Sequence, residues 1–117
     1  MCTGTGVQAI VSKKYSKRVT ASDIREQSIQ NAILNSKINN LTNITFLTSD
    51  LLKNISGKYD LITANPPYGI VSKNPDDKTY GLHTVFELIE NLDNHLNNGG
   101  MAKIITESVV KNGKDMV

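Results

Sequence analysis

The sequence predicts an α/β fold, a doubly wound and mostly parallel sheet covered by helices, and three observations support this prediction. Short runs of β-branched and aromatic residues alternate along the chain with segments whose apolar residues recur at helical spacing. Glycine, proline or acidic residues follow these runs, where the turns between strands and helices belong. The length of 117 residues suits a single domain. Strands that alternate with helices pair in parallel, with the connecting helices on the faces of the sheet.

The first half of the chain is expected to hold two helices and two strands. A glycine-containing turn at residues 2–6 leads into an apolar helix at 7–15. A short strand at 18–23 comes next and ends in a carboxylate. The helix expected at 24–37 has apolar positions at Ile29, Ala32, Ile33 and Ile38. The β-branched and aromatic stretch at 44–50 repeats the strand pattern and closes with Ser-Asp.

The second half continues the alternation. A strand is expected at 59–64 and a helix at 84–96, whose sheet-facing residues would be Val85, Leu88, Ile89, Leu92 and Leu96. The Asn-Asn-Gly-Gly sequence at 97–100 tolerates positive φ and is expected to end that helix. A strand at 101–106 and the start of a further helix near Ser108 complete the prediction.

The sequence Asn65-Pro66-Pro67-Tyr68 follows the strand at 59–64 and has a distinct chemistry. A residue before proline is excluded from the helical region, and two prolines remove two N–H donors. The Asn65 side-chain oxygen and the Pro66 carbonyl can then accept both hydrogens of an amino or amide nitrogen. Tyr68 is expected to lie flat against the group that is held. The alternative is a plain Pro-Pro strand terminator without a binding role.

The glycine loop and Asp23 form a second candidate site. Glycines at positions 4 and 6 let the backbone approach a ligand closely. Together with Ala9 they also fit G-x-G-x-x-A, the dinucleotide-binding fingerprint. Asp23 follows the next strand, where a parallel α/β fold presents an acid to a ribose diol. The alternative role for Asp23 is that of an ordinary N-cap for the following helix.

These motifs, in this order, resemble those of the amino-methyltransferases, class I S-adenosylmethionine-dependent enzymes with a Rossmann-like fold. The resemblance extends from Cys2 to Thr106 and implies that Asn65, Pro66 and Tyr68 hold the nitrogen to be methylated. It implies S-adenosylmethionine as the cofactor, with Asp50 close to the adenine amino group. Asp50 could instead cap the turn that follows it. The cofactor-binding residues implied by the resemblance are Thr3, Gly4, Thr5, Gly6, Asp23, Ile24, Asp50, Leu51 and Asn65.

The same resemblance bears on the substrate. In the glutamine-methylating enzymes that act on peptide release factors, an Asp-Gly-Leu follows the Asn-Pro-Pro-Tyr loop, whereas this chain has a tyrosine at position 80 before Gly-Leu. The resemblance implies protein glutamine as the leading substrate and RNA or DNA adenine as the second, and the tyrosine at position 80 is a departure from the glutamine-methylating pattern. The polar stretch at 69–81 is expected to be a lid or substrate loop. A fragment of an NAD(P)-binding oxidoreductase and an inactive methyltransferase remnant are the alternative interpretations.

The resemblance also implies that the domain, residues 1–117, is partial. A class I methyltransferase has a central first strand before the glycine loop and two final strands, and none of the three is expected here. The strands at 18–23 and 59–64 should then have unpaired edges.

Composition bounds the remaining possibilities. The net charge of +2 says little about partners, and we expect no segment to span a membrane, which indicates a cytoplasmic protein. Cys2 is the only cysteine, so an intramolecular disulfide or a cysteine-based metal cluster is excluded. His83 and His95 have no acidic or cysteine companion at ligand spacing, so no metal is expected.

Overall fold

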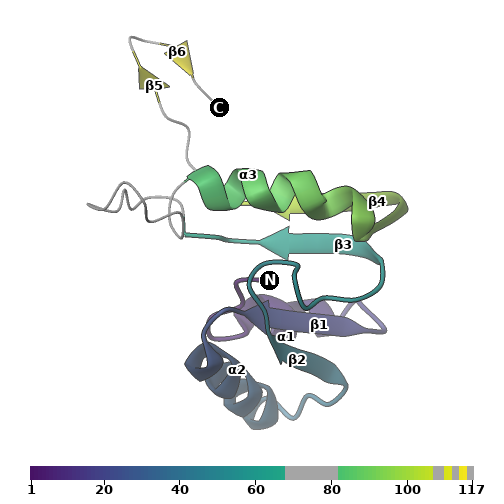
Figure 1. The fold of residues 1–117 in the computed structure, drawn as a ribbon. Helices are drawn as coiled ribbons and strands as arrows, with labels where there is room; N and C mark the ends of the chain where they lie inside the picture. The colour runs from purple at the N-terminus through teal and green to yellow at the C-terminus, as the bar shows by residue number, and fades with distance from the viewer. Residues whose placement is uncertain (68–81, 107–109, 112–113, 116–117) are drawn as a thin grey trace.

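The computed structural model describes residues 1–67, 82–106, 110–111 and 114–115. Helices and strands alternate from residue 7 to 48 and again from 59 to 104, as the sequence predicted, while no helix separates the strands at 44–48 and 59–64 (Figure 1). The elements are α1 (Val7–Lys13), β1 (Val19–Asp23), α2 (Glu26–Ile38), β2 (Ile44–Thr48), β3 (Tyr59–Ala64), α3 (Leu82–Asn91), the 3-10 helix η1 (Leu92–Asn94), β4 (Leu96–Ile104), β5 (Val110–Lys111) and β6 (Lys114–Asp115).

The four strands β1 to β4 form two parallel pairs, each joined by a crossover helix. β1 pairs in parallel with β2 and α2 connects them, whereas β3 pairs in parallel with β4 and α3 connects them. This arrangement confirms the α/β class, since parallel strands need such crossover connections. Among the strands that the structure describes, β1 has no neighbour besides β2, and β3 has none besides β4. The sheet is therefore open between β1 and β3.

Two small cores hold the pairs and their helices together. Ala9 of α1, Ala21 of β1 and Ile29 and Ala32 of α2 are all buried. Small alanine side chains at three of these four positions let the helices approach the strand closely. The second core joins α3 and η1 to β3 and consists of Leu51, Leu52, Ile62, Ala64, Leu88 and Leu92. Full burial of one such leucine contributes about 1.5–3 kcal/mol.

The region from 84 to 104 differs from the prediction. The helix expected to continue to residue 96 ends at Asn91 and gives way to η1, and β4 already begins at Leu96. The Asn-Asn-Gly-Gly sequence therefore lies within β4, opposite β3, where Asn97 Nδ2 donates to Asp60 Oδ1 at 2.8 Å. The expected helix end at this sequence was wrong, because the helix already stops at Asn91. Residues 97–100 still bend the chain, since they form a bulge between the pairs Tyr59–Leu96 and Leu61–Met101 and Gly99 has φ +77°. Ile89, expected to face the sheet, is 50% exposed.

Smaller differences lie at helix ends. α1 ends two residues earlier than predicted, and the Lys13 ammonium donates to the carbonyl oxygens of Ser16 and Lys17 at 3.4 and 2.9 Å. Ile38, at the end of α2, is 68% exposed instead of packed. The predicted helix start at Ser108 and the loop expected at 69–81 lie outside the described residues. The segments just after Ser108 are β5 and β6, which pair antiparallel.

Candidate cofactor-binding and acceptor site

The chain start joins the carboxyl ends of β1 and β3. The Met1 ammonium donates to the Thr63 carbonyl oxygen at 2.8 Å, and the Thr3 N–H donates to the Ser22 carbonyl oxygen at 2.9 Å. Thr63 and Ser22 are each the last residue but one of their strands. The glycine loop that follows Thr3 therefore lies where open α/β sheets bind ligands, outside the carboxyl ends of the strands.

Asp23 fastens the glycine loop to β1. Its Oδ2 accepts the Gly4 N–H at 2.9 Å and its Oδ1 accepts the Arg25 N–H at 3.0 Å, while the residue is only 7% exposed. The N-cap position of α2 is Arg25, which makes no side-chain cap bond, so Asp23 is not an ordinary N-cap. Each carboxylate oxygen accepts more than one hydrogen bond, so Asp23 retains acceptor capacity for hydroxyl groups.

The two glycines of the loop have different surroundings. Gly6 has φ +83°, and a Cβ there would lie 2.8 Å from the Cβ of Ala32, so it allows α1 to pack against α2. Gly4 has φ +50°, and a Cβ there would meet nothing within 4 Å. The space over Gly4 is therefore open to a ligand, whereas Gly6 serves packing. Thr3 is half-buried and Thr5 exposed beside them.

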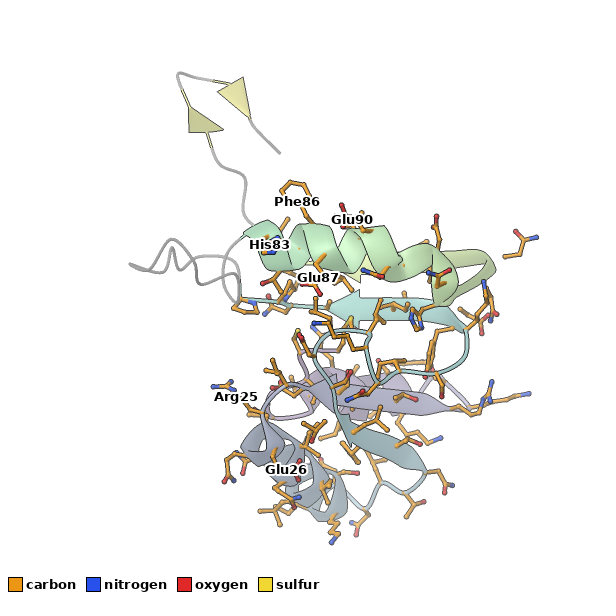
Figure 2. All side chains as sticks on the ribbon, viewed as in Figure 1. Arg25, Glu26, His83, Phe86, Glu87 and Glu90 are labelled. Carbon is orange, nitrogen blue, oxygen red and sulfur yellow. The ribbon has the colours of Figure 1, made fainter. Side chains whose placement is uncertain are left out.

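Asp50, expected near the adenine, lies just after β2 and is held by Lys53. The Lys53 ammonium pairs with Asp50 and, at 3.4 Å, with Glu87 Oε1. Glu87 lies on the side of α3 toward β3, whereas Phe86 points away (Figure 2). The hydrogen bond to Asp50, with a further one to Glu87, raises the pKa of the Lys53 ammonium.

No described hydrogen bond shows the Asp50 carboxylate capping the turn that follows it. The Lys53 N–H donates to the Asp50 carbonyl oxygen at 3.0 Å, which closes this turn through the backbone. The Asp50 side chain stays 45% exposed. Leu51 has φ +48° and packs its side chain into the core, so only its backbone could face a cofactor. Ile24, by contrast, is 53% exposed beside Asp23 and offers an apolar surface.

The predicted acceptor turn begins immediately after β3. The Ile105 N–H donates to the Ala64 carbonyl oxygen at 2.9 Å, which is the last contact of β3 with the strand beside it before the turn. Pro66 is among the largest fully buried side chains, and its burial anchors the turn. Asn65 is exposed and contributes to the lining of a cleft. Tyr68 lies outside the described residues.

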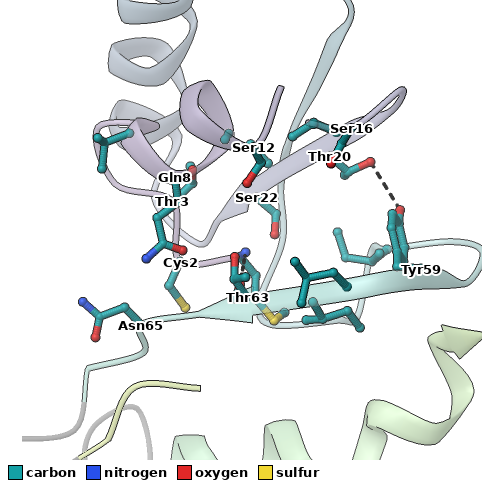
Figure 3. Close-up of a pocket in the computed structure, with 18 of the residues that line it drawn as sticks. Cys2, Thr3, Gln8, Ser12, Ser16, Thr20, Ser22, Tyr59, Thr63 and Asn65 are labelled. Atoms are coloured by element: carbon teal, nitrogen blue, oxygen red, sulfur yellow. Dashed lines mark hydrogen bonds between the residues drawn. The ribbon is translucent and has the colours of Figure 1, made fainter. Parts of the chain in front are cut away.

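That cleft has a volume of about 320 Å³ and runs between β1 and β3 (Figure 3). Asn65 and Gly4 line it at the carboxyl ends of the strands, and Arg18 and Tyr59 line it toward their amino ends. The Tyr59 hydroxyl donates across it to Thr20 Oγ1 at 3.4 Å. The cleft therefore follows the open strand edges and is not a pocket over the strand ends alone. The sequence prediction of unpaired edges pointed to this opening, but not to Tyr59.

The described part of the chain offers few other sites. It contains no group of three or more histidine, cysteine, aspartate or glutamate residues that could hold a metal ion. None of its helices is long and apolar enough to cross a membrane. The residues at the strand ends fit an adenosine-containing group, since Asp23 can accept hydroxyls, Gly4 leaves open space and Ile24 offers an apolar surface.

Comparison with known proteins shows the family. The model of the methyltransferase small domain matches residues 1–116. A putative protein N5-glutamine methyltransferase of Methanocaldococcus jannaschii is 34% identical over 117 aligned positions, covering 91% of this chain and 59% of the relative. The ribosomal RNA small subunit methyltransferase C of Haemophilus ducreyi is 37% identical over 90 positions, covering 77% of this chain and 25% of the relative.

A solved structure agrees with these relatives. The ribosomal protein L11 methylase of Lactobacillus delbrueckii subsp. bulgaricus superposes with a TM-score of 0.72 at 32% identity, over 87% of this chain and 46% of that one. The chain thus spans about half of these proteins or less, except for the archaeal relative, of which it spans 59%. The Rossmann-like fold is confirmed. The chain belongs to the methyltransferase small domain family, whose methyl donor is S-adenosylmethionine.

Proposed function

We propose that this chain is the catalytic core of an S-adenosylmethionine-dependent methyltransferase that acts on a planar nitrogen. The acceptor is the side-chain amide of a protein glutamine in the first place, and the amino group of RNA or DNA adenine in the second. The observation that carries the proposal is the position of the Asn65-Pro66 turn. It lies at the same strand-end edge as the contact between Gly4 and Asp23, and buried Pro66 anchors it.

The cofactor half of the site would be formed by the ends of β1 and β2. Asp23 is held rigidly by two backbone N–H donors, and its remaining lone pairs can accept the ribose hydroxyls. Gly4 allows the close approach that a side chain would hinder. Ile24 would pack against the adenine, and Asp50 would accept from its amino group.

The acceptor half would be formed by the turn after β3. When bound, S-adenosylmethionine supplies an electrophilic methyl group. The Asn65 side-chain oxygen and the Pro66 carbonyl would accept the two hydrogens of the acceptor nitrogen and so fix its direction. Orientation of this kind supplies up to about 7–11 kcal/mol in well-aligned reactions. The same two oxygens would stabilise the positive charge that develops on the nitrogen during transfer.

The substrate order rests on the names of the relatives. A putative N5-glutamine methyltransferase matches nearly the whole chain, whereas the rRNA methyltransferase matches a shorter part of it. Both an amide and an exocyclic amino group present two hydrogens in one plane, so the same turn suits both.

The test separates acceptor binding from cofactor binding. We expect Asn65→Ala to reduce methyl transfer about 100-fold or more, the scale of losing one stabilising group in the transition state. Affinity for S-adenosylhomocysteine, measured by calorimetry, should change less than about twofold if Asn65 acts on the acceptor. Asn97→Ala, an exposed asparagine of β4, is the matched control and should leave both quantities unchanged.

The assay measures transfer of a labelled methyl group from S-adenosylmethionine to a glutamine-containing peptide and, separately, to an adenine-containing RNA. Loss of cofactor binding in parallel with transfer in Asn65→Ala would contradict the assigned role. Binding of NADH in preference to S-adenosylhomocysteine would refute the proposed function itself.

A further inference from the structure

We propose that Lys53 is a positioning residue for recognition of the adenine amino group of the cofactor. Lys53 does not contact the adenine itself. Its ammonium holds one oxygen of the Asp50 carboxylate and leaves the other oxygen to accept a hydrogen bond from the amino group. The inference rests on the proposed function, since it concerns the cofactor half of that site.

Asp50 lies beside the proposed ribose acceptor. The Ser49 N–H donates to the Asp23 carbonyl oxygen at 2.9 Å, so the carboxyl ends of β1 and β2 adjoin. Burial raises the pKa of the Cys2 thiol, and the negative charges of Asp23 and Asp50 raise it further. Both carboxylates therefore lie close to the glycine loop, as two acceptors for one ligand must.

The backbone of the turn after β2 is fixed by its own hydrogen bonds. The buried Ser49 hydroxyl donates to the Leu51 carbonyl oxygen at 2.9 Å and accepts the Asn54 N–H at 3.0 Å. The Lys53 N–H donates to the Asp50 carbonyl oxygen at 3.0 Å. The Cα atoms of Asp50 and Lys53 therefore have defined places, and only the torsions of these two side chains remain to be set.

Lys53 sets the direction of the Asp50 carboxylate. The ammonium bonds Asp50 Oδ2, and no other side chain in the described part of the chain bonds this carboxylate. The Asp50 side chain is 45% exposed, so packing alone does not hold it. A carboxylate oxygen accepts more than one hydrogen bond, so Oδ1 keeps its acceptor capacity for a ligand.

Glu87 of α3 holds the ammonium from the other side. Glu87 Oε1 lies 3.4 Å from Lys53 Nζ, and the Glu87 side chain lies on the side of α3 toward β3 (Figure 2). Two carboxylates thus share one cation. Without the ammonium they would remain close together as two like charges, which repel. Removal of Lys53 would therefore drive the Asp50 side chain away from the position that it has in the pair.

The ion pair acts on recognition more than on folding. The Lys53 side chain is 59% exposed, and exposed pairs contribute little to stability because solvent screens them. The same pair orders the Asp50 side chain before the cofactor arrives, so binding does not have to immobilise it. Loss of Lys53 should therefore leave the fold intact and show itself in binding.

The test measures, by calorimetry on the full chain, how well two ligands are distinguished. One is S-adenosylhomocysteine, and the other is its analogue with an unsubstituted purine, which lacks the 6-amino group. We expect the unchanged chain to bind S-adenosylhomocysteine about fivefold or more tightly than the analogue, because the analogue leaves the Asp50 carboxylate without its donor. Lys53→Met should lower this preference below about twofold, chiefly by weakening S-adenosylhomocysteine.

Two further variants serve as controls. Lys53→Arg keeps a charged donor and should retain a preference of about threefold or more. Lys37→Met removes the same charge from an exposed lysine in the last turn of α2 and should keep the full preference. Circular dichroism spectra would compare the folding of the variants.

The outcomes separate this inference from the proposed function. A full preference in Lys53→Met would overturn the inference, and so would equal weakening of both ligands, because a merely structural role weakens both alike. A preference in Lys53→Arg as low as in Lys53→Met would count against it in the same way. An unchanged chain that binds both ligands equally would also overturn it and leave the methyltransferase function standing. An unchanged chain that does not bind S-adenosylhomocysteine would refute the proposed function, and the inference with it.

Discussion

Gly6 provides the sharpest test of how the glycine loop at residues 2–6 packs at the start of α1. Replacement by alanine introduces two costs. The first is backbone strain, since φ is +83° and a left-handed conformation costs an L-residue about 1–2 kcal/mol. The second is steric, because the new Cβ would lie 2.8 Å from Ala32 Cβ and 3.1 Å from Ala32 Cα. These atoms belong to the helix itself and cannot rotate away, so the overpacking cost is about 1–3 kcal/mol.

The net effect also includes the unfolded state. Alanine loses less chain entropy on folding than glycine, which offsets about 0.4–1 kcal/mol. We therefore expect Gly6→Ala to lower the free energy of unfolding by about 2–4 kcal/mol. Gly4→Ala is the matched control, because its φ is also positive, +50°, but its Cβ would meet nothing within 4 Å. Its cost should be the strain alone, about 1 kcal/mol after the same offset.

Urea unfolding followed by circular dichroism measures both changes, with the free energy extrapolated linearly to water. Equal destabilisation by the two substitutions would refute the packing role of Gly6. The two substitutions should affect the affinity for S-adenosylhomocysteine in the opposite order, when binding is measured under conditions where both variants are folded. Gly4→Ala would weaken binding more than Gly6→Ala, because only Gly4 lies below open space.

Four further predictions concern three side chains. Asp23→Asn replaces an acceptor oxygen with a donor that faces a backbone N–H, and should cost about 1.5–3 kcal/mol in urea unfolding. Lys53→Met should shift the urea midpoint little, because its ion pairs are exposed and screened. Burial raises the pKa of the Cys2 thiol, so iodoacetamide should alkylate the folded chain at pH 8 more slowly than the chain in urea. Above the usual thiol pKa of 9.0 the unfolded chain loses this proton first, so stability should fall with pH in the wild type more than in Cys2→Ala.

Local sequence signals predicted most elements of the fold. β1, β2, β3 and α2 lie within about two residues of their predicted bounds, because their patterns repeat with the periods of strand and helix. The error came at residues 92–100, where the expected helix and its terminal turn are replaced by η1 and by the start of β4, with residues 97–100 as a bulge in that strand. The partner that decides this, β3, lies more than 30 positions earlier, since Tyr59 pairs with Leu96. A local pattern carries no information about such a partner.

The candidate site was predictable to a similar degree. The glycines and Asp23 were identified, and the structure brings Gly4 and Asp23 into contact. The sequence did not show that Gly6 serves packing whereas Gly4 leaves open space, because this difference depends on Ala32 of α2 lying against Gly6. The bond from Lys53 to Glu87 was also missed, since it joins the turn after β2 to α3. In both cases the sequence alone does not show which helix packs against which turn.

The open cleft divides the proposed active site into two halves. The cofactor half rests on β1 and its loop, whereas the acceptor turn extends from β3. In the described residues the direct polar contacts between the two halves are few: those of Met1 with Thr63, Tyr59 with Thr20 and Lys53 with Glu87. Methyl transfer needs both halves within a fraction of an ångström of the reactive geometry, whereas cofactor binding needs chiefly the first. Weakening a contact between the halves, such as that of Tyr59 with Thr20, would therefore act on the rate of transfer far more than on the affinity for the cofactor.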